Sequence, residues 1–251
     1  MVELLYGRRP VYEALRAGRR RVYKLMLAEG LRGKGGGVGQ IVSMARTAAV
    51  PLANVPRREL DRVVSNHQGI IAEASSYPYA DLGDLLSFAT DRNEPPLFLL
   101  LDLLQDPQNF GSLLRTAEAV GVHGVVMPQR RTVGVTPAVV SASAGAVEHL
   151  RVARVTNLAR TLDELKGHDL WVAGLEAAEE AELYDQTDLR GPLALVVGSE
   201  GSGLRRLVRE KCDFLVRLPM IGRVASLNAA VAGSVALYEV ERQRRAGKID
   251  H

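Results

Sequence analysis

LALVVGSEGSGLRRL, residues 193–207, joins five apolar residues to a glycine-rich turn and then to a basic amphipathic run. A short apolar run that ends in a turn and continues as a helix is typical of α/β folds. In such folds, ligands bind beyond the carboxyl ends of the parallel strands. The sequence therefore predicts a ligand site at this turn, with Glu200 at its tip.

The residues of this turn exclude two familiar phosphate-binding motifs. Gly198, Gly201 and Gly203 read G-x-x-G-x-G, whereas the dinucleotide fingerprint reads G-x-G-x-x-G. Leu204 and Arg205 follow the last glycine, where a phosphate-binding loop requires Lys followed by Ser or Thr. The pattern argues against a nicotinamide-dependent oxidoreductase and against a P-loop nucleotidase.

The sequence around this turn, from residue 97 to the end, alternates between short apolar runs and helical patterns. Strands are predicted at 97–101, 124–127, 150–155, 170–175, 193–197 and 214–218. Helices are predicted at 108–120, 136–147, 157–166 and 203–211. Asp106 and Thr136, each followed by proline, are typical N-caps of such helices. The alternation predicts a mostly parallel sheet covered by helices on both faces.

The amino-terminal part of the chain predicts a second, smaller α/β unit. Apolar runs at 22–27, 52–55 and 70–74 alternate with helical stretches at 8–17, 38–49 and 57–64. Residues 30–39, GLRGKGGGVG, are expected to form a loop. We expect a first domain at 1–76, a linker without clear period at 77–96, and a second domain at 97–251.

The basic charge is concentrated in the first part of the chain. Residues 1–80 hold 13 Lys and Arg against 6 Asp and Glu, and residues 81–251 hold 19 against 23. The overall charge of +3 thus combines +7 and −4. A basic surface of this kind favours a polyanionic partner, and RNA is the partner we expect.

Composition restricts the class of protein further. The 251 residues are 47% hydrophobic and 24% charged, without an apolar run approaching the roughly 18 residues of a membrane span and without a signal peptide. We expect a cytoplasmic protein that does not associate with membranes. A single cysteine, Cys212, excludes an internal disulfide, and the five histidines lack metal-ligand spacing, so no metal is expected.

Three motifs together carry a resemblance to a known family. D-P-x-N-x-G-x-x-x-R spans 106–115, G-x-E-G-x-G spans 198–203 and S-L-N-x-x-x-A spans 226–232. In this order and spacing they resemble the SpoU (TrmH) family of RNA 2'-O-ribose methyltransferases, which belongs to the SPOUT superfamily. The opening YGRRPVYEALRAG and NHQGIIAE, residues 66–73, resemble the ribosomal-protein-like substrate-binding domain of that family, although RRP at 8–10 departs from its usual residues.

The resemblance implies a fold, a cofactor and a set of site residues. It implies a C-terminal SPOUT-type domain with a deep trefoil knot, homodimerisation through that domain, and S-adenosylmethionine as methyl donor. The implied cofactor contacts are Gly198, Glu200, Leu218, Met220, Ile221, Ser226 and Leu227. The implied catalytic residues are Asn109, Arg115, Glu200, Ser226 and Asn228.

The implied reaction is transfer of a methyl group to a ribose 2'-hydroxyl, and the resemblance favours a guanosine of 23S rRNA as target. We interpret Arg115 as a group that holds a substrate phosphate, because a guanidinium does not lose its proton in proteins. Either a substrate phosphate or a protein group then accepts the hydroxyl proton. The alternatives are another rRNA or tRNA site, and a catalytically silent RNA-binding or ribosome-assembly protein.

Two structural expectations concern the last helix. Ser226 is a natural N-cap for the helical pattern that follows it. Leu227, Val231, Val235 and Tyr238 recur at helical spacing, so we expect this stripe to be core or dimer face.

Overall fold

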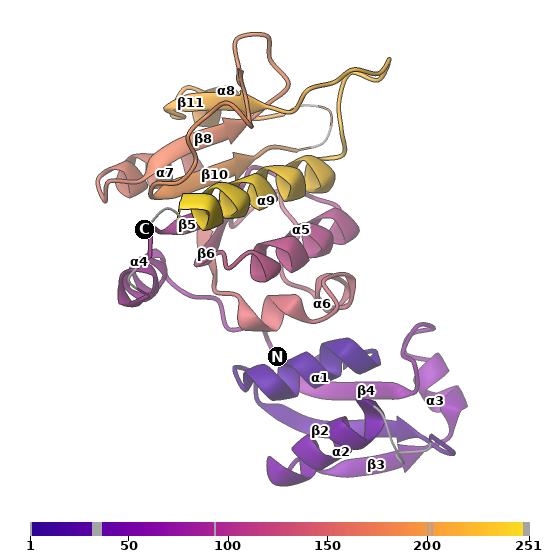
Figure 1. The fold of residues 1–251 in the computed structure, drawn as a ribbon. Helices are drawn as coiled ribbons and strands as arrows, with labels where there is room; N and C mark the ends of the chain where they lie inside the picture. The colour runs from indigo at the N-terminus through magenta and orange to yellow at the C-terminus, as the bar shows by residue number, and fades with distance from the viewer. Residues whose placement is uncertain (1, 32–36, 93, 200, 202, 248–251) are drawn as a thin grey trace. The chain divides into compact units, whose positions relative to one another are not determined.

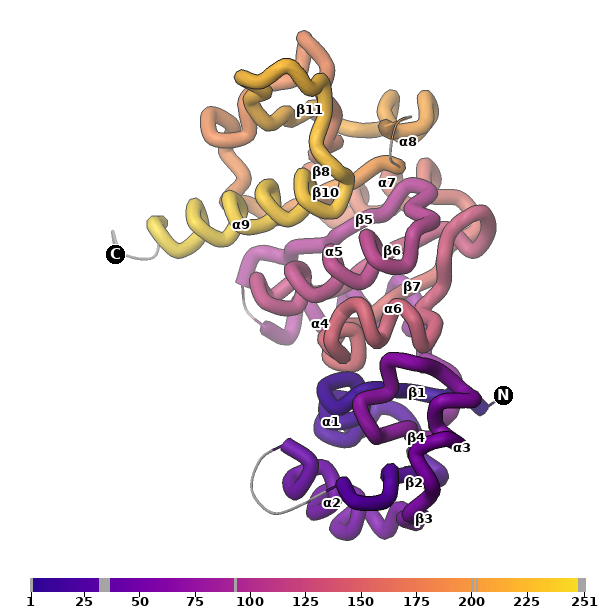
Figure 2. The backbone as a smooth tube through the Cα atoms, turned by 90° about the vertical axis from the view of Figure 1, so that its right-hand side faces the viewer, coloured from indigo at the N-terminus to yellow at the C-terminus, as the bar shows by residue number. Residues whose placement is uncertain are grey.

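A computed structural model describes residues 2–31, 37–92, 94–199, 201 and 203–247 of the chain. The chain divides into two compact units, shown in Figures 1 and 2. Unit 1 comprises Met1–Pro78 and Val135–His149, and unit 2 comprises Tyr79–Gly134 and Leu150–His251. The chain therefore enters unit 1 twice.

Unit 1 is built on a mixed sheet. Its strands are β1 (Val2–Tyr6), β2 (Val22–Ala28), β3 (Leu52–Val55) and β4 (Ile70–Ser75), in the order β1-β4-β2-β3. Its helices are α1 (Arg8–Ala17), α2 (Gly37–Thr47), α3 (Arg57–Asp61), α6 (Pro137–Ala142) and the 3₁₀ helix η1 (Ala146–His149). The three strands predicted here are confirmed. β1 was not predicted from the sequence, and it pairs with β4 over its whole length.

Unit 2 is built on a parallel sheet. Its strands are β5 (Leu97–Leu101), β6 (Gly124–Pro128), β7 (Val152–Val155), β8 (Trp171–Leu175), β9 (Glu182–Leu183), β10 (Leu193–Val197) and β11 (Phe214–Arg217). In the described part of the chain they form one seven-stranded sheet in the order β7-β6-β5-β10-β8-β11-β9, and every pairing is parallel. The predicted parallel sheet is confirmed, with the short edge strand β9 in addition.

Helices cover both faces of this sheet because alternate residues of the buried strands point to opposite sides. Phe98, Leu100 and Val196 face a core completed by α4 (Leu82–Asp91), α7 (Leu158–Lys166) and α8 (Arg206–Arg209). α5 (Pro107–Ala119) and α9 (Ala229–Gly247) lie side by side, joined by a 2.8 Å hydrogen bond between the Thr116 and Ser234 hydroxyls. A Cβ at Gly233 of α9 would lie 2.9 Å from Leu113 and 3.1 Å from Val197, so glycine permits this packing against α5 and β10.

The segment expected as a linker contains a structured helix. Residues 82–91 form α4, which opens with a reciprocal capping box between Asp81 and Asp84. Leu85 and Ala89 of α4 are fully or almost fully buried in the core of unit 2. The polar residues around these two apolar positions obscured the helical period in the sequence.

The predicted helix at 136–147 is shorter than expected. Thr136 caps α6 as predicted, accepting a hydrogen bond from the Val139 amide at 3.4 Å. The helix ends because Ala144 and Gly145 adopt φ angles of 52° and 86°, and η1 follows. A side chain at Gly145 would lie 2.8 Å from Glu13 Cβ, so glycine allows this segment to pack closely against α1.

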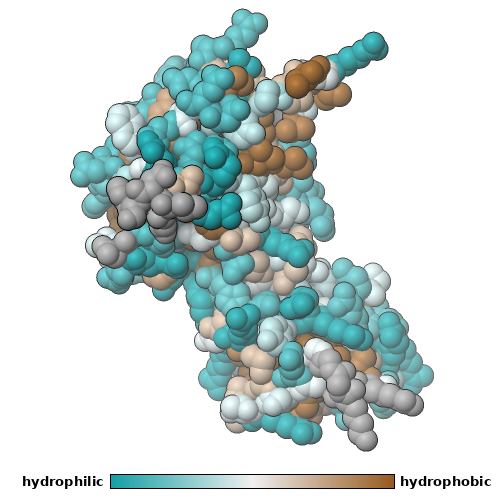
Figure 3. All heavy atoms as spheres, viewed as in Figure 1, coloured by the Kyte–Doolittle hydropathy of each residue, from teal (hydrophilic) through white to brown (hydrophobic). Residues whose placement is uncertain are grey.

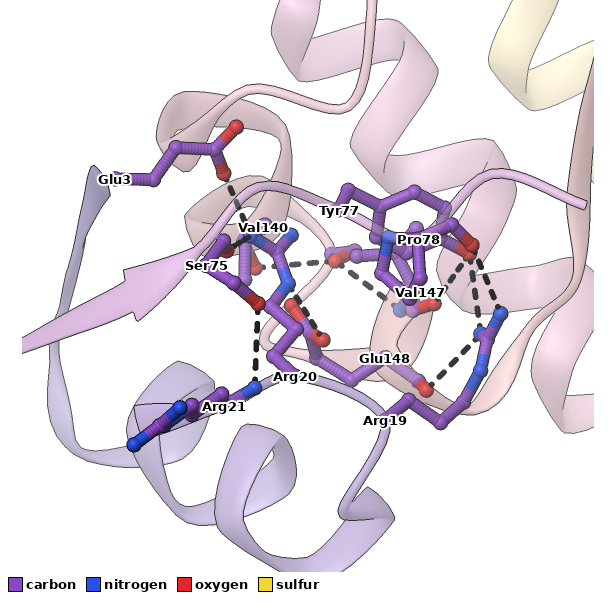
Figure 4. A network of polar contacts seen from close by, with 11 residues as sticks. Glu3, Arg19, Arg20, Arg21, Ser75, Tyr77, Pro78, Val140, Val147 and Glu148 are labelled. Carbon is purple, nitrogen blue, oxygen red and sulfur yellow. Dashed lines mark hydrogen bonds and ion pairs between the residues drawn. The ribbon is translucent and has the colours of Figure 1, made fainter. Parts of the chain in front are cut away.

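A buried ion-pair network holds the returning segment in unit 1 (Figure 4). The Arg20 guanidinium is fully buried; its Nε donates to Glu148 Oε2 at 3.0 Å and its Nη1 donates to Glu3 Oε2 at 2.6 Å. Glu148 lies in η1 and is itself fully buried. One cation therefore joins β1 to a segment more than a hundred residues later in the chain.

Tyr77 completes this network beside Arg19. The Arg19 Nη1 donates to the Tyr77 hydroxyl at 3.2 Å, and the Tyr77 hydroxyl donates to the Val147 carbonyl at 3.3 Å. Burial raises the pKa of Tyr77 to about 12, so the phenol stays protonated and keeps this donor. Burial also raises the pKa of Glu148, and the charge of Arg20 opposes that change.

Replacing Arg20 by Ala should strongly destabilise unit 1, because Glu3 and Glu148 would lose their common cation inside the protein. We expect the free energy of the opening that exposes the β1 and β4 amides of unit 1 to fall by about 3 kcal/mol or more. The measurement is native-state hydrogen exchange of the β1 and β4 amides. Arg21→Ala is the control, because that side chain is exposed and should change stability by less than about 0.5 kcal/mol. Equal protection in the two variants would contradict the role of Arg20.

Candidate active site

The carboxyl ends of three adjacent strands surround the first candidate cavity. β10, β8 and β11 are neighbours in the parallel sheet, and the loops that follow them line a cavity of about 280 Å³. The first turns of α9 close its remaining side through Ala229 and Ala232. Five of the residues predicted for cofactor binding line this cavity: Gly198, Leu218, Met220, Ser226 and Leu227.

The glycine turn after β10 is closed by a pair of backbone hydrogen bonds. The Ser199 amide donates to the Gly203 carbonyl, the Gly203 amide donates to the Ser199 carbonyl, and both distances are 3.1 Å. A Cβ at Gly198 would lie 2.4 Å from the carbonyl carbon and oxygen of Gly203. Because backbone fills that space, only glycine fits at 198. Glu200, predicted at the tip of this turn, lies outside the described residues.

A buried carboxylate that was not predicted from the sequence holds the far end of the same turn. Asp102 follows β5 and has no exposed surface. Its carboxylate accepts a hydrogen bond from the Arg205 amide at 2.8 Å and another from Arg205 Nε at 2.6 Å. The sequence signal was present, since an acidic residue directly after an apolar strand lies at the ligand-binding edge of a parallel sheet.

A second acidic residue, Glu176, follows β8 and lines the cavity. Arg209 of α8 donates from Nε to Glu176 Oε2 at 2.7 Å and also pairs with Glu180. The Glu176 carboxylate lies against Gly203, where an added Cβ would be 3.3 Å from Oε1. Glu176 thus supports the glycine turn from the β8 side.

Two of the predicted catalytic residues are brought together from distant parts of the chain. Asn228 Nδ2 donates to Asn109 Oδ1 at 3.0 Å, which joins the start of α9 to the first turn of α5. Asn228 Oδ1 accepts from the amides of Ala230 and Val231 at 2.9 Å and 3.2 Å. Asn228 is therefore the N-cap of α9, and the expectation that Ser226 caps this helix is wrong because the helix begins three residues later.

The remaining predicted residues differ in whether they line the cavity. Arg115 lies on α5 with an exposed side chain. Ser226 lines the cavity, whereas Ile221 is 98% exposed and does not line it. The N-cap predicted at Asp106 is confirmed: its carboxylate accepts from the Asn109 amide at 2.8 Å, which fixes the first turn of α5.

Two kinds of feature, a metal site and a membrane-spanning helix, are absent from the described residues. No group of three or more His, Cys, Asp or Glu side chains that could hold a metal ion occurs among them. No helix in the described ranges is long and apolar enough to cross a membrane.

Comparison with known families gives the fold and the site a context. The model of the SpoU rRNA Methylase family matches residues 96–238, which is more than half of the chain and includes the whole cavity. The chain belongs to the SpoU rRNA methylase family. A second family model, RNA 2'-O ribose methyltransferase substrate binding, matches residues 4–80 of this SpoU methylase. The family prediction made from the three motifs is confirmed.

Relatives and solved structures resemble this SpoU methylase along almost its whole length. YacO of Bacillus subtilis (strain 168), named as a TrmH family tRNA/rRNA methyltransferase, is 49% identical over 244 residues, which is 96% of each chain. A Staphylococcus haemolyticus protein of the same family name is 44% identical over 243 residues, again 96% of each chain.

Two crystal structures show a similar fold. The SpoU methyltransferase AviRb from Streptomyces viridochromogenes, in complex with the cofactor AdoMet, matches with a TM-score of 0.81 and 26% identity over 98% of this chain and 92% of that chain. An RNA 2'-O ribose methyltransferase matches with a TM-score of 0.77 and 30% identity over 97% and 89% of the two chains. The predicted SPOUT-type α/β class is confirmed.

Replacing Gly198 by Ala should force the glycine turn away from β10. We expect the free energy of unfolding of unit 2 to fall by about 1–3 kcal/mol, because the added methyl overlaps backbone that cannot move independently. Trp171, the only tryptophan of the chain, lies in β8 of unit 2 and reports urea unfolding through its fluorescence. Gly191→Ala is the matched control, since nothing lies within 4 Å of a Cβ there. Equal midpoints for both variants would refute the close approach at Gly198.

Proposed function

We propose that this SpoU methylase uses S-adenosylmethionine to methylate the 2'-hydroxyl of a guanosine in 23S rRNA. The observation that carries the proposal is the cavity at the ends of β8, β10 and β11, with the Asn109–Asn228 pair beside it. All three motifs of the family meet at this one edge of the sheet. The match to the substrate-binding model at residues 4–80 supports RNA as the substrate.

The lining of the cavity fits the proposed cofactor. Apolar walls from Leu175, Leu218 and Leu227 suit an adenosine and an aliphatic chain, and Glu176 supplies a negative charge. Gly198 and Gly203 line the cavity with backbone atoms alone. When bound, S-adenosylmethionine supplies a methyl group on a positively charged sulfur, which leaves as a neutral thioether.

The chain's own residues must orient the ribose hydroxyl and place a proton acceptor beside it. As the hydroxyl oxygen forms its bond to the methyl carbon, the carbon–sulfur bond breaks toward sulfur and the hydroxyl proton must leave. We assign Asn109, Asn228 and Ser226 to orienting the ribose at the mouth of the cavity. Glu200 is assigned to cofactor binding and catalysis, as the G-x-E-G-x-G motif implies.

Arg115 is assigned to the developing negative charge on the ribose oxygen. A guanidinium remains protonated, so Arg115 acts as a fixed cation and hydrogen-bond donor. In this proposal it holds a substrate phosphate, which accepts the hydroxyl proton. Its exposed position on α5 leaves the guanidinium open to RNA.

The last helix supports the proposal of a homodimer. The stripe Leu227, Val231, Val235 and Tyr238 is 44%, 49%, 37% and 54% exposed, so it is not core of this chain. Figure 3 shows hydrophobic residues over the amino-terminal half of α9 and on the loop that precedes it. Burial of this stripe against a second copy would remove apolar surface from water beside the cavity.

Three further features complete the proposal. The C-terminal domain, residues 97–251, carries the methyltransferase site and a trefoil knot, with residues 1–76 as the RNA-binding domain and 77–96 between them. The basic charge of the first 80 residues supports that division of labour. The protein works in the cytoplasm, where its RNA substrate is assembled into ribosomes.

Replacing Arg115 by Ala should abolish methyl transfer while S-adenosylmethionine binding is retained. Loss of one charge-stabilising donor typically lowers kcat by about 10²–10³-fold. The assay transfers labelled methyl groups to unmodified 23S rRNA, 16S rRNA and tRNA in parallel, and mass spectrometry locates the modified nucleotide. Cofactor binding is measured separately by calorimetry. Arg190→Ala is the control, because Arg190 is exposed and pairs with Asp188 before β10.

The outcomes of this assay separate the alternatives. A single 2'-O-methylguanosine in 23S rRNA supports the proposal, and a product in tRNA or 16S rRNA would move the target but keep the reaction. Bound cofactor and RNA without transfer by the wild type would favour the silent RNA-binding alternative. Full activity of Arg115→Ala would remove Arg115 from the mechanism.

Asn228 allows its capping role to be separated from its bond to Asn109. Asn228→Ser keeps a good N-cap for α9 but is too short to reach Asn109, so the free energy of unfolding should change by less than about 0.5 kcal/mol. We expect kcat to fall because the hydrogen bond between Asn228 and Asn109 is lost. Asn228→Ala should in addition lose about 1 kcal/mol of stability. An unchanged kcat in Asn228→Ser would show that the Asn109–Asn228 hydrogen bond has no part in catalysis.

A further inference from the structure

A second cavity, of about 580 Å³, lies on unit 2 away from the candidate active site. It is formed where β5, β6 and β7 end, and its walls include Pro128, the last residue of β6, with Leu103 and Thr156 from the segments that follow β5 and β7. The first residues of α7 and of α8, two helices that pack together, complete it. None of the residues of the three family motifs lines this cavity.

Four arginines stand around this second cavity: Arg130, Arg131, Arg205 and Arg206. Arg205 is paired with Asp102 at 2.6 Å, and Arg206 is paired with Glu210 at 2.8 Å. Within the described ranges, no carboxylate lies within 4 Å of the exposed guanidinium of Arg130 or Arg131. The cavity therefore carries an excess of two positive charges, which favours an anionic ligand.

The loop that carries Arg130 and Arg131 is firmly anchored. The Gln129 amide donates to the Val155 carbonyl at 2.8 Å, and Arg154 Nη2 donates to the Gln129 carbonyl at 2.8 Å. On the other side, the Thr132 hydroxyl donates to the Leu104 carbonyl at 2.7 Å and the Val133 amide donates to it at 3.1 Å. The backbone between these anchors is held in place, so the two guanidinium groups are presented from a fixed base.

Backbone conformation on both sides of the cavity is unusual. Arg131 has a φ angle of 61° and Leu103 has one of 64°, in the left-handed region that side chains other than those of Gly, Asn and Asp rarely adopt. The anchoring hydrogen bonds hold these conformations. Such outliers concentrate at ligand sites, which agrees with a binding role for this cavity.

The wall chemistry favours a nucleotide over a free inorganic anion. Pro128, Leu158 and Val208 supply an apolar floor beneath the arginine rim. A free phosphate would gain nothing from such a floor, whereas a ribose or a base covers apolar surface while its phosphate meets the arginines. RNA is the nucleotide polymer on which this family acts.

The distance between the second cavity and the candidate active site determines which nucleotide of the substrate can occupy the second cavity. In the sheet, β6 is three places from β8, and neighbouring strands lie about 4.8 Å apart, so the two cavities are roughly 14 Å apart at the same edge. A nucleotide in the second cavity therefore lies close in the strand to the nucleotide that is methylated. Arg205 lies between the two cavities, since it follows the glycine turn of the first cavity and lines the second.

We propose that this second cavity binds a backbone phosphate and its nucleoside on the substrate strand, near the methylated ribose. The inference rests on the proposed function, because it takes RNA as the substrate. Arg130 and Arg131 hold the phosphate, and the apolar floor receives the attached nucleoside. The cavity positions the RNA and takes no part in methyl transfer itself.

The test is the double variant Arg130→Ala, Arg131→Ala in the full chain, with Arg190→Ala as the exposed arginine control. Filter binding of an in vitro transcribed 23S rRNA is measured over a series of KCl concentrations without cofactor. We expect the dissociation constant to rise about tenfold or more, and the slope of log K against log salt to shrink by about 1. In methyl-transfer assays, the KM for RNA should rise while kcat and the affinity for S-adenosylmethionine stay unchanged.

Several outcomes would overturn this inference without touching the proposed function. Equal RNA affinity and salt slope in the double variant and the control would show that the cavity does not bind RNA. Calorimetric titration with inorganic phosphate distinguishes the other source: tight phosphate binding that the double variant loses, with unchanged RNA affinity, would make this a free-anion site. If the wild type binds RNA but transfers no methyl group, the proposed function fails and filter binding still decides the role of the arginines.

Discussion

The structure of the candidate active site depends on a buried carboxylate. Asp102 directly follows β5, the neighbour of the middle strand β10, and accepts hydrogen bonds from both the amide and the guanidinium of Arg205, so the end of β5 is fixed to the end of the glycine turn after β10. A buried charge requires such partners, and losing one of them would cost several kcal/mol. Because the turn is held at this end and closed between Ser199 and Gly203, the backbone at Gly198 stays open toward the cavity. The floor of the first cavity and the rim of the second share this one anchor.

Local sequence signals predicted the elements of the fold well where a single segment determines them. The apolar run 193–197 and the caps at Asp106 and Thr136 have the same consequence in any context, because a buried strand and an unsatisfied helix start demand these residues. α4 and β1 were missed because their partners are distant. Leu85 and Ala89 mark a helix only once the sheet that buries them is known, and β1 gains its register from β4 nearly seventy residues later.

The site residues divide in the same way. Gly198, Met220 and Leu227 follow from the family resemblance, and all three line the cavity. Ser226 was expected to cap α9 because serine is a good N-cap, but the loop continues to Asn228, whose amide can cap the helix and reach Asn109 at the same time. A hydroxyl is too short for that second contact. Asp102 and Glu176 each follow an apolar strand directly, which marks them for the ligand-binding edge of the sheet, but their partners Arg205 and Arg209 lie far along the chain and could not be assigned from the sequence.

Ribose methylation gives the enzyme no base edge to read at the reacting atom, so selectivity must come from RNA shape and from contacts elsewhere on the strand. The chain meets this requirement with charge at separate places. The basic excess lies in the first 80 residues, while unit 2 as a whole is not basic and carries Arg130 and Arg131 at the end of the sheet. A cation beside the reacting ribose, such as Arg115 in the proposed mechanism, meets a phosphate that any RNA carries, whereas anchored arginines at a set distance from the first cavity accept only a strand that passes both points. A rigid parallel sheet is suited to this, because strand order alone fixes the distance between the two cavities.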